Sequence, residues 1–204
     1  YMINRKLFIG LVISLVLAFV FTWVTFNNEN VFWYFYSFTT LFLTASSFYF
    51  SKLEDQLKTF NYLFWGIVYG IGTYLLCFLG LQLLELLPSK ATKEVSHFFG
   101  VFAPSALWHY ILLFFIIIPG EEFFWRGFIQ NAVKNWFSPT LAILTSSVLY
   151  GASFIVSGFY IGVFFAIIVG IIFGWLYEKK KSMPLNIVAH IVFLLLLFLV
   201  LPLI

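Results

Sequence analysis

The stretch IPGEEFFWRGF, Ile118–Phe128, places three ionisable side chains within six residues of an otherwise apolar segment. The preceding residues 110–119 carry no charge. An ionisable side chain at bilayer depth costs about 2.5–3.5 kcal/mol on insertion scales. Glu121, Glu122 and Arg126 are therefore expected to face the interior of a helix bundle or a water-filled cavity, and the segment around them decides the fold.

The composition indicates a membrane protein. Of the 204 residues, 63% are hydrophobic and 9% are charged, whereas an average soluble domain is about a quarter charged. A soluble fold of this size could not bury so much apolar surface. The single Cys77 excludes an intrachain disulfide framework. The net charge of +3, scattered over loops, does not suggest a nucleic-acid partner, so the lipid bilayer is the first partner expected.

Seven apolar runs are long enough to span a bilayer, which takes roughly 20 residues in a helix. They cover about 7–26, 31–50, 61–87, 106–133, 139–157, 159–177 and 184–204. Because the runs are continuously apolar rather than alternating, they favour helices over a barrel. We predict an all-α polytopic bundle of about seven transmembrane helices. It forms a single membrane domain, 1–204, with a three-span region at 1–104 and a four-span core at 105–204.

The basic residues predict a cytoplasmic N-terminus, because short cytoplasmic loops are rich in Lys and Arg. With this orientation eight basic residues lie inside: Arg5, Lys6, Lys52, Lys58, Lys134, Lys179, Lys180 and Lys181. Two, Lys90 and Lys93, lie outside, and Arg126 lies within a span. The more polar link 88–98 is expected to be a solvated connection.

The spacing of the charged cluster suggests two different carboxylates. On a helix Glu122 and Arg126 lie four residues apart and can pair, whereas Glu121 points about 100° away. Glu121 would then keep a free carboxylate that could take a proton from water. The adjacent Pro119-Gly120 is expected to kink the helix and admit water. The alternative is a buried ion-pair network that only fixes helix packing.

Two histidines lie within predicted spans. His190, in NIVAHIVF, is expected to face the acidic helix or to be a packed core residue. His109 lies about 18 Å along a helix from Glu121 and is interpreted as an interfacial residue beside Trp108 and Tyr110.

The stretch EEFFWRGFIQ resembles the EExxxR motif of the CPBP family of CAAX prenyl proteases and bacteriocin-processing enzymes, also called Abi. The resemblance covers roughly residues 105–200. It implies a helical intramembrane endopeptidase in which Glu121 activates water, Glu122 and Arg126 shape the site, and a histidine such as His190 polarises the scissile carbonyl. Two further family motifs, F-x-x-x-H and H-x-x-x-N or D, supply a second histidine and a polar partner.

The chain departs from both of these motifs. YGASF, at 150–154, has Tyr150 in place of Phe and Phe154 in place of His, and Leu194 occupies the Asn or Asp position after His190. Phe cannot accept a proton and Leu cannot donate to an oxyanion, although hydroxyls of Tyr150 and Ser153 lie nearby in sequence.

A metal is not required by this chemistry. The chain has no H-E-x-x-H motif, and zinc would need about three protein ligands. Glu121, Glu122 and His190 could supply them only in a geometry that the sequence does not establish.

Three functions remain open from the sequence. The first is a non-catalytic family member, a pseudoprotease candidate that binds or regulates a membrane protein or peptide. The second is an active intramembrane endopeptidase with a reduced site, reached from the cytoplasmic side. A transporter or ion pathway is the third, because acid clusters within spans also mark proton routes. Each would place the chain in a membrane, and we expect a bacterial cytoplasmic membrane.

Overall fold

The computed structural model describes residues 5–51, 55, 57–85 and 91–200. Nearly all of them lie in helices, and this part of the chain contains no strand. The helices are α1 (Arg5–Phe26), α2 (Phe32–Phe50), α3 (Thr59–Glu85), α4 (Ala91–Phe102), α5 (Leu107–Leu112), α6 (Ile118–Glu122), α7 (Asn131–Val133), α8 (Pro139–Ser153), α9 (Tyr160–Lys180) and α10 (Met183–Leu195). The predicted all-α fold is confirmed.

Helices α5, α6 and α7 are parts of one continuous helix, Leu107–Val133, which we call the site helix. Two π-helical segments, Leu113–Ile117 and Phe123–Gln130, interrupt its α-helical hydrogen bonding. The first ends just before Pro119, which lacks the N–H that an α-helix would use. The helix thus continues through Pro119 and Gly120 by widening into π turns, which are frequent at functional sites.

Within the described residues, six helical stretches are long and apolar enough to cross a membrane: Arg5–Phe26, Thr59–Leu84, Leu107–Val133, Pro139–Ser157, Tyr160–Lys180 and Met183–Val200. They correspond to six of the seven predicted spans. The remaining predicted span, 31–50, is the helix α2, which carries many Tyr, Ser and Thr residues and is not among the six. Residues 86–87 and 201–204 of the predicted spans lie outside the described residues.

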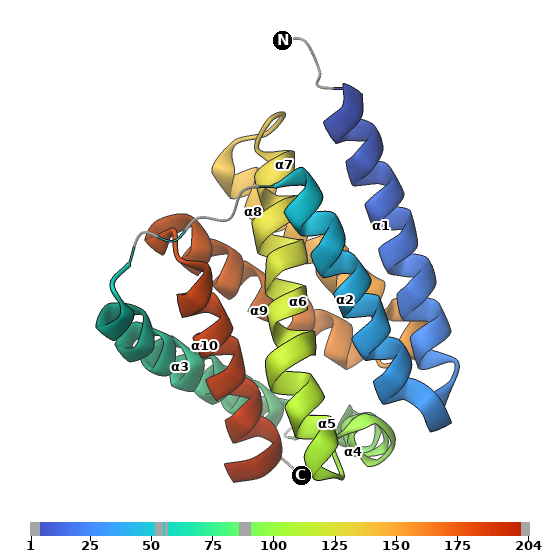
Figure 1. Cartoon of the computed structure of the whole chain (residues 1–204). Helices are drawn as coiled ribbons and strands as arrows, with labels where there is room; N and C mark the ends of the chain where they lie inside the picture. Colours follow the sequence, from blue (N-terminus) through green and yellow to red (C-terminus); the bar gives the residue numbers. More distant parts are fainter. Residues whose placement is uncertain (1–4, 52–54, 56, 86–90, 201–204) are drawn as a thin grey trace.

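The site helix lies at the centre of the bundle (Figure 1). Helices α2 and α1 pack on one side of it and α10 and α3 on the other, while α8 and α9 pair with each other. Gly120 allows α2 to approach closely, because a Cβ on Gly120 would lie 2.9 Å from the backbone oxygen of Thr40. The predicted loosening at Pro119-Gly120 is thus a point of tight packing between helices.

The surface of the bundle is apolar and part of its interior is polar. Helix α1 exposes Val12, Val16 and Trp23, while Ser14 and Thr22 on the same helix are buried. So large an exposed apolar surface is not typical of a soluble monomer. Apolar side chains outside and polar side chains inside support contact of the bundle surface with lipid.

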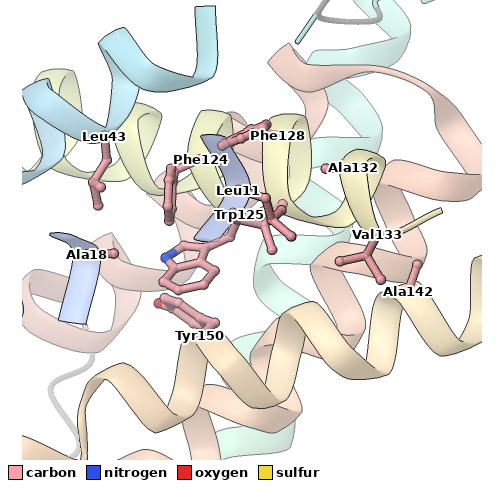
Figure 2. Close-up of a cluster of buried hydrophobic side chains, with 11 residues drawn as sticks. Leu11, Ala18, Leu43, Phe124, Trp125, Phe128, Ala132, Val133, Ala142 and Tyr150 are labelled. Carbon is pink, nitrogen blue, oxygen red and sulfur yellow. The ribbon is translucent and has the colours of Figure 1, made fainter. Parts of the chain in front are cut away.

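A hydrophobic core packs around the second half of the site helix (Figure 2). Phe124 and Phe128 are fully buried. The ring of Trp125 lies against that of Tyr150 on α8, with centroids 5.6 Å apart in an edge-to-face arrangement. This core fixes the rotation of the site helix and therefore the direction of its charged side chains.

Helix α4 closes the end of the bundle opposite the start of α1 (Figure 1). Val95 is buried and Phe98 and Phe99 are partly buried, whereas Glu94 and His97 are exposed. The link predicted as a solvated connection is therefore an amphipathic helix from residue 91 onward, and residues 88–90 lie outside the described part.

The basic residues assigned to the cytoplasm gather in part at one end of the bundle. Lys134 and Lys181 both bind Glu178, with nitrogen–oxygen distances of 2.9 and 2.7 Å. Lys52 and Lys90, which also entered the orientation argument, lie outside the described residues. The cytoplasmic N-terminus stays a prediction.

Candidate functional site

The three charged residues of the site helix all lie inside the bundle. Glu121, Glu122 and Arg126 expose 6%, 0% and 2% of their surface. The sequence predicted that these charged side chains would face the interior of the bundle, and their burial agrees with that prediction. The two adjacent carboxylates point to different sets of partners.

Glu122 is the centre of a buried polar network. His190 Nδ1 donates to Glu122 Oε1 at 2.9 Å, and Asn186 Nδ2 donates to Oε2 at 3.2 Å. Asn186 also donates to the Phe173 carbonyl at 2.8 Å, which links α10 to α9. Arg126 Nη1 lies 3.2 Å from Glu122 Oε1, so the predicted pair is present.

Arg126 is held more by charge and ring contacts than by hydrogen bonds. The described residues give its Nη1 and Nη2 atoms no hydrogen-bond partner of good geometry. Its guanidinium carbon lies 4.9 Å from the ring centroid of Tyr150 and 5.7 Å from that of Phe173. The cation therefore lies between aromatic rings and one carboxylate, where it balances the charge of Glu122.

Glu121 accepts hydrogen bonds from two tyrosines. Tyr36 of α2 donates to Oε1, and Tyr150 of α8 donates to Oε2 at 3.2 Å. The two carboxylates do diverge as predicted. The free carboxylate expected at Glu121 is instead engaged by hydroxyls from two other helices.

A cavity of about 200 Å³ lies beside Glu121. Glu121, Tyr36, Tyr150 and His190 supply its polar groups. Its apolar wall includes Phe26, Phe32, Trp33, Phe98, Phe102, Phe154, Phe165, Phe193, Leu194 and Phe198. Both substituted motif positions, 154 and 194, are thus brought to the cavity together with the first Glu of the motif.

The cavity lies toward the end of the bundle that α4 covers. Phe26 and Phe32 come from the adjoining ends of α1 and α2, and Phe98 and Phe102 come from α4. These elements lie at the end opposite the start of α1 (Figure 1). With the predicted cytoplasmic N-terminus this is the outer end, whereas approach from the cytoplasmic side was expected from the sequence.

Two other candidates have local roles. Ser153 is buried, and its hydroxyl donates to the Tyr150 carbonyl at 2.7 Å, within its own helix. It therefore supports α8 and is not among the residues that line the cavity. His109 stacks on Trp33, with centroids 4.6 Å apart, and accepts from the Ser105 backbone N–H at 3.0 Å, far along the site helix from Glu121.

Sequence reasoning missed Tyr36 and Asn186. Asn186 precedes His190 by four residues, so the helical spacing could have placed both on one face of α10. Tyr36 lies 85 residues before Glu121 in the chain, and no local pattern marks it among the many aromatic residues.

No group of three or more His, Cys, Asp or Glu side chains within the described residues is arranged to hold a metal ion. Glu122 and His190 meet, but the Glu121 oxygens face tyrosine hydroxyls. The geometry that zinc would need from these three side chains is therefore not formed.

The site as a whole offers one carboxylate, two phenol hydroxyls and one imidazole to an otherwise apolar cavity. A carboxylate can accept a proton or bind a donor, and the hydroxyls can donate or accept. His190 uses Nδ1 for Glu122, which leaves Nε2 as the ring nitrogen for the cavity. The carboxylate behind it fixes the orientation of the imidazole, as carboxylate–histidine pairs commonly do.

These features define a polytopic helical membrane protein with an acidic site inside the bundle. Residues 103–196 match the family model described as Rce1-like, type II CAAX prenyl endopeptidase Rce1-like. This part of the chain is therefore an Rce1-like region of the CPBP family, which confirms the resemblance drawn from the EExxxR motif. No curated protein and no solved structure matches the chain significantly.

Proposed function

We propose that this chain is a non-hydrolytic member of the Rce1-like family that binds an apolar group of a membrane partner in the cavity beside Glu121. One observation carries the proposal: both oxygens of the Glu121 carboxylate accept tyrosine hydroxyls, while Phe154 and Leu194 form part of the cavity wall.

The hydrogen bonds of Glu121 weaken the case for a general base. Such a base must come within about 2.6–3.2 Å of the water whose proton it takes. At Glu121, Tyr36 and Tyr150 already donate to the oxygens that a water would have to approach. Both donors come from helices that pack on the site helix, so a water could approach only the remaining lone pairs of the carboxylate.

The substituted positions remove the other groups that the family resemblance implies. Phe154 lines the cavity where the motif has a histidine, and it can neither accept a proton nor orient a water. Leu194 lines it where the motif has Asn or Asp, and it cannot donate to the oxygen on which negative charge develops. The remaining His190 is bound to Glu122.

The cavity is better suited to binding than to hydrolysis. Its volume of about 200 Å³ is well above the about 10–15 Å³ that a single water needs. Ligand sites are typically concave and mostly apolar with a few placed polar groups. Aromatic walls supply large contact area to an apolar occupant.

A second function, an active endopeptidase in which Glu121 activates water, is favoured by one observation. Glu121 and His190 line the same cavity, so an acid and an imidazole do face one space. For hydrolysis a water would have to bind a lone pair of Glu121 that Tyr36 and Tyr150 leave open, beside the scissile carbonyl.

The experiment that separates the two functions is a cleavage assay. The purified protein in liposomes is incubated with a library of apolar peptides, and the products are identified by mass spectrometry. We expect no cleavage by the wild-type protein above that of Glu121→Gln, which is nearly isosteric and keeps one oxygen acceptor, while its amide nitrogen can donate to the hydroxyl oxygen of the other tyrosine. Products that depend on Glu121 would overturn the proposal and establish the second function. The double variant Phe154→His, Leu194→Asn serves as a test of whether restoring the motif produces activity.

Partner binding is tested with a photoreactive phenylalanine. Placed at Phe102, which lines the cavity, it should form an adduct with a defined membrane protein or peptide in native membranes. The matched control is Phe115 of the site helix, which is 75% exposed on the surface of the bundle. Equal adducts at both positions, or none at Phe102, would count against a partner in the cavity.

A further inference from the structure

The cavity beside Glu121 has few charged or titratable side chains in its wall. Of the described residues that line it, Glu121 is the only acid, and none is Lys or Arg. Arg126 does not line the cavity and lies with Glu122 at 3.2 Å. Glu121 therefore faces the cavity without a lysine or arginine beside it, and the one histidine of the cavity wall, His190, uses its Nδ1 for Glu122.

The hydrogen bonds of Glu121 leave acceptor capacity. An ionised carboxylate offers about four lone-pair sites, and Tyr36 and Tyr150 occupy two of them. Both donors are neutral, whereas buried charges in proteins are usually paired. Intramembrane acids in particular pair with a cation or mark a pathway.

We propose that the group which enters this cavity and reaches Glu121 is a primary ammonium carried on an unbranched apolar chain. An ammonium has three donors for the remaining lone pairs of the carboxylate. The aromatic ring of Tyr36, which lines the cavity beside Glu121, can also attract a cation by its face. A lysine side chain of a membrane partner and a free alkylamine share this chemistry, because each has an apolar stem and a compact charged head.

The apolar stem has room beside the carboxylate. A second cavity of about 130 Å³ shares Phe165 and Phe193 with the first, and no polar surface lines it. Cys77, Leu81 and Val95 form part of its wall. The surroundings of the cavity are therefore apolar on the side of Phe165 and Phe193, where an unbranched stem would pack while its head meets Glu121.

This inference rests on the proposed function in that Glu121 acts as an acceptor for a bound group and not as a base. It goes further by naming the charge and shape of that group. The probe is decylamine, compared with decanol and decanoate, which have the same chain and a neutral or negative head. Thermal unfolding of the protein in nanodiscs is recorded at equal concentration of each compound in the membrane.

We expect decylamine to raise the Tm, decanol to raise it less, and decanoate to leave it unchanged or lower it. Glu121→Gln should weaken decylamine binding about tenfold or more, since a hydrogen bond to a charged group is lost. Ala166→Trp, which fills the cavity without changing the carboxylate, should abolish the shift. Glu94→Gln removes an exposed acid on α4 and should keep the wild-type response, which controls for general attraction of cations to the surface.

Two results would overturn the inference: decanoate stabilising the protein as well as decylamine does, or the decylamine shift surviving in Glu121→Gln. A second arm separates the sources of the ammonium. A short apolar peptide with one lysine is compared with the same peptide carrying norleucine, and a preference for lysine points to a peptide partner. If only decylamine binds, the source is a free amine.

Failure of this inference is distinguishable from failure of the proposed function. Peptide cleavage that depends on Glu121 would refute the non-hydrolytic role, whatever decylamine does. Binding of decanoate in preference to decylamine, with no cleavage, would refute the ammonium and leave partner binding standing.

Discussion

Removing the charge of Arg126 tests whether the buried polar network is held together by electrostatics. The side chain is 2% exposed, and its Nη1 lies 3.2 Å from a Glu122 that is fully buried. Replacement by Met keeps an apolar body of similar length between Tyr150 and Phe173 and deletes the cation. Because Glu122 is then a buried charge without its counterion, Arg126→Met should lower the free energy of unfolding by about 3–5 kcal/mol.

The double variant Glu122→Gln, Arg126→Met distinguishes charge from packing. It removes both charges, while the amide oxygen introduced at position 122 can still accept a hydrogen bond from Asn186 or from His190. Replacing a buried pair by neutral groups is often nearly neutral in stability, so the double variant should be more stable than Arg126→Met alone. The coupling between the two positions should be about 1–3 kcal/mol.

The assay is reversible unfolding in mixed micelles by titration with SDS, followed by far-UV circular dichroism. The four proteins of the cycle are compared at the same detergent composition. A loss of less than about 1 kcal/mol in Arg126→Met would show that solvent or lipid screens this pair, in contrast to the burial seen here. A double variant that loses the sum of the two single losses would show that the side chains act only through packing.

Three further outcomes are expected in the same unfolding assay. Gly151→Ala should destabilise the protein by about 1–3 kcal/mol, because its Cβ would lie 2.9 Å from a backbone oxygen of α9. The control is Gly72→Ala, where the Cβ meets nothing within 4 Å, and it should be neutral or stabilising. Equal losses of stability in the two variants would refute the packing argument. Tyr36→Phe should lower the free energy of unfolding by about 1.5–3 kcal/mol, because the Glu121 carboxylate loses the hydroxyl that donates to it. An unchanged stability would show that this hydrogen bond does not form. Lys134→Met breaks an ion pair of partly exposed groups and should change stability by no more than about 1 kcal/mol, so a larger loss would place that pair in a far less solvated setting.

The sequence predicted the fold class and the burial of the acidic cluster because both depend on local transfer energies. Runs of about 20 apolar residues have few stable alternatives to a helix in hydrocarbon. The same energetics require Glu122 and Arg126 to face protein, and their spacing on a helix pairs them. The polar composition of 31–50 shows where this reasoning weakens, since α2 is a helix but its hydropathy does not mark it as a span.

The partners of each charged group were decided only by the tertiary structure. Tyr36 and Tyr150 reach Glu121 from two other helices, 85 and 29 residues away in the chain. His190 was expected to face the acidic helix or to pack in the core, and only the structure shows that its Nδ1 binds Glu122, 68 residues away. Contacts between helices depend on how side chains interlock across the bundle, and the periodicity of one helix does not encode them.

The end of the bundle at which the cavity lies was likewise set by packing. Charge in the loops suggested approach from the side of Lys134, but α4 and the adjoining ends of α1 and α2 build the cavity at the opposite end. The sequence by itself thus determined that a helical bundle must bury two acids and an arginine, because charged side chains are costly to place in the hydrocarbon of the bilayer. The tertiary structure alone decided which carboxylate is paired and which faces the cavity, because that choice follows from the rotation at which the site helix packs against its neighbours.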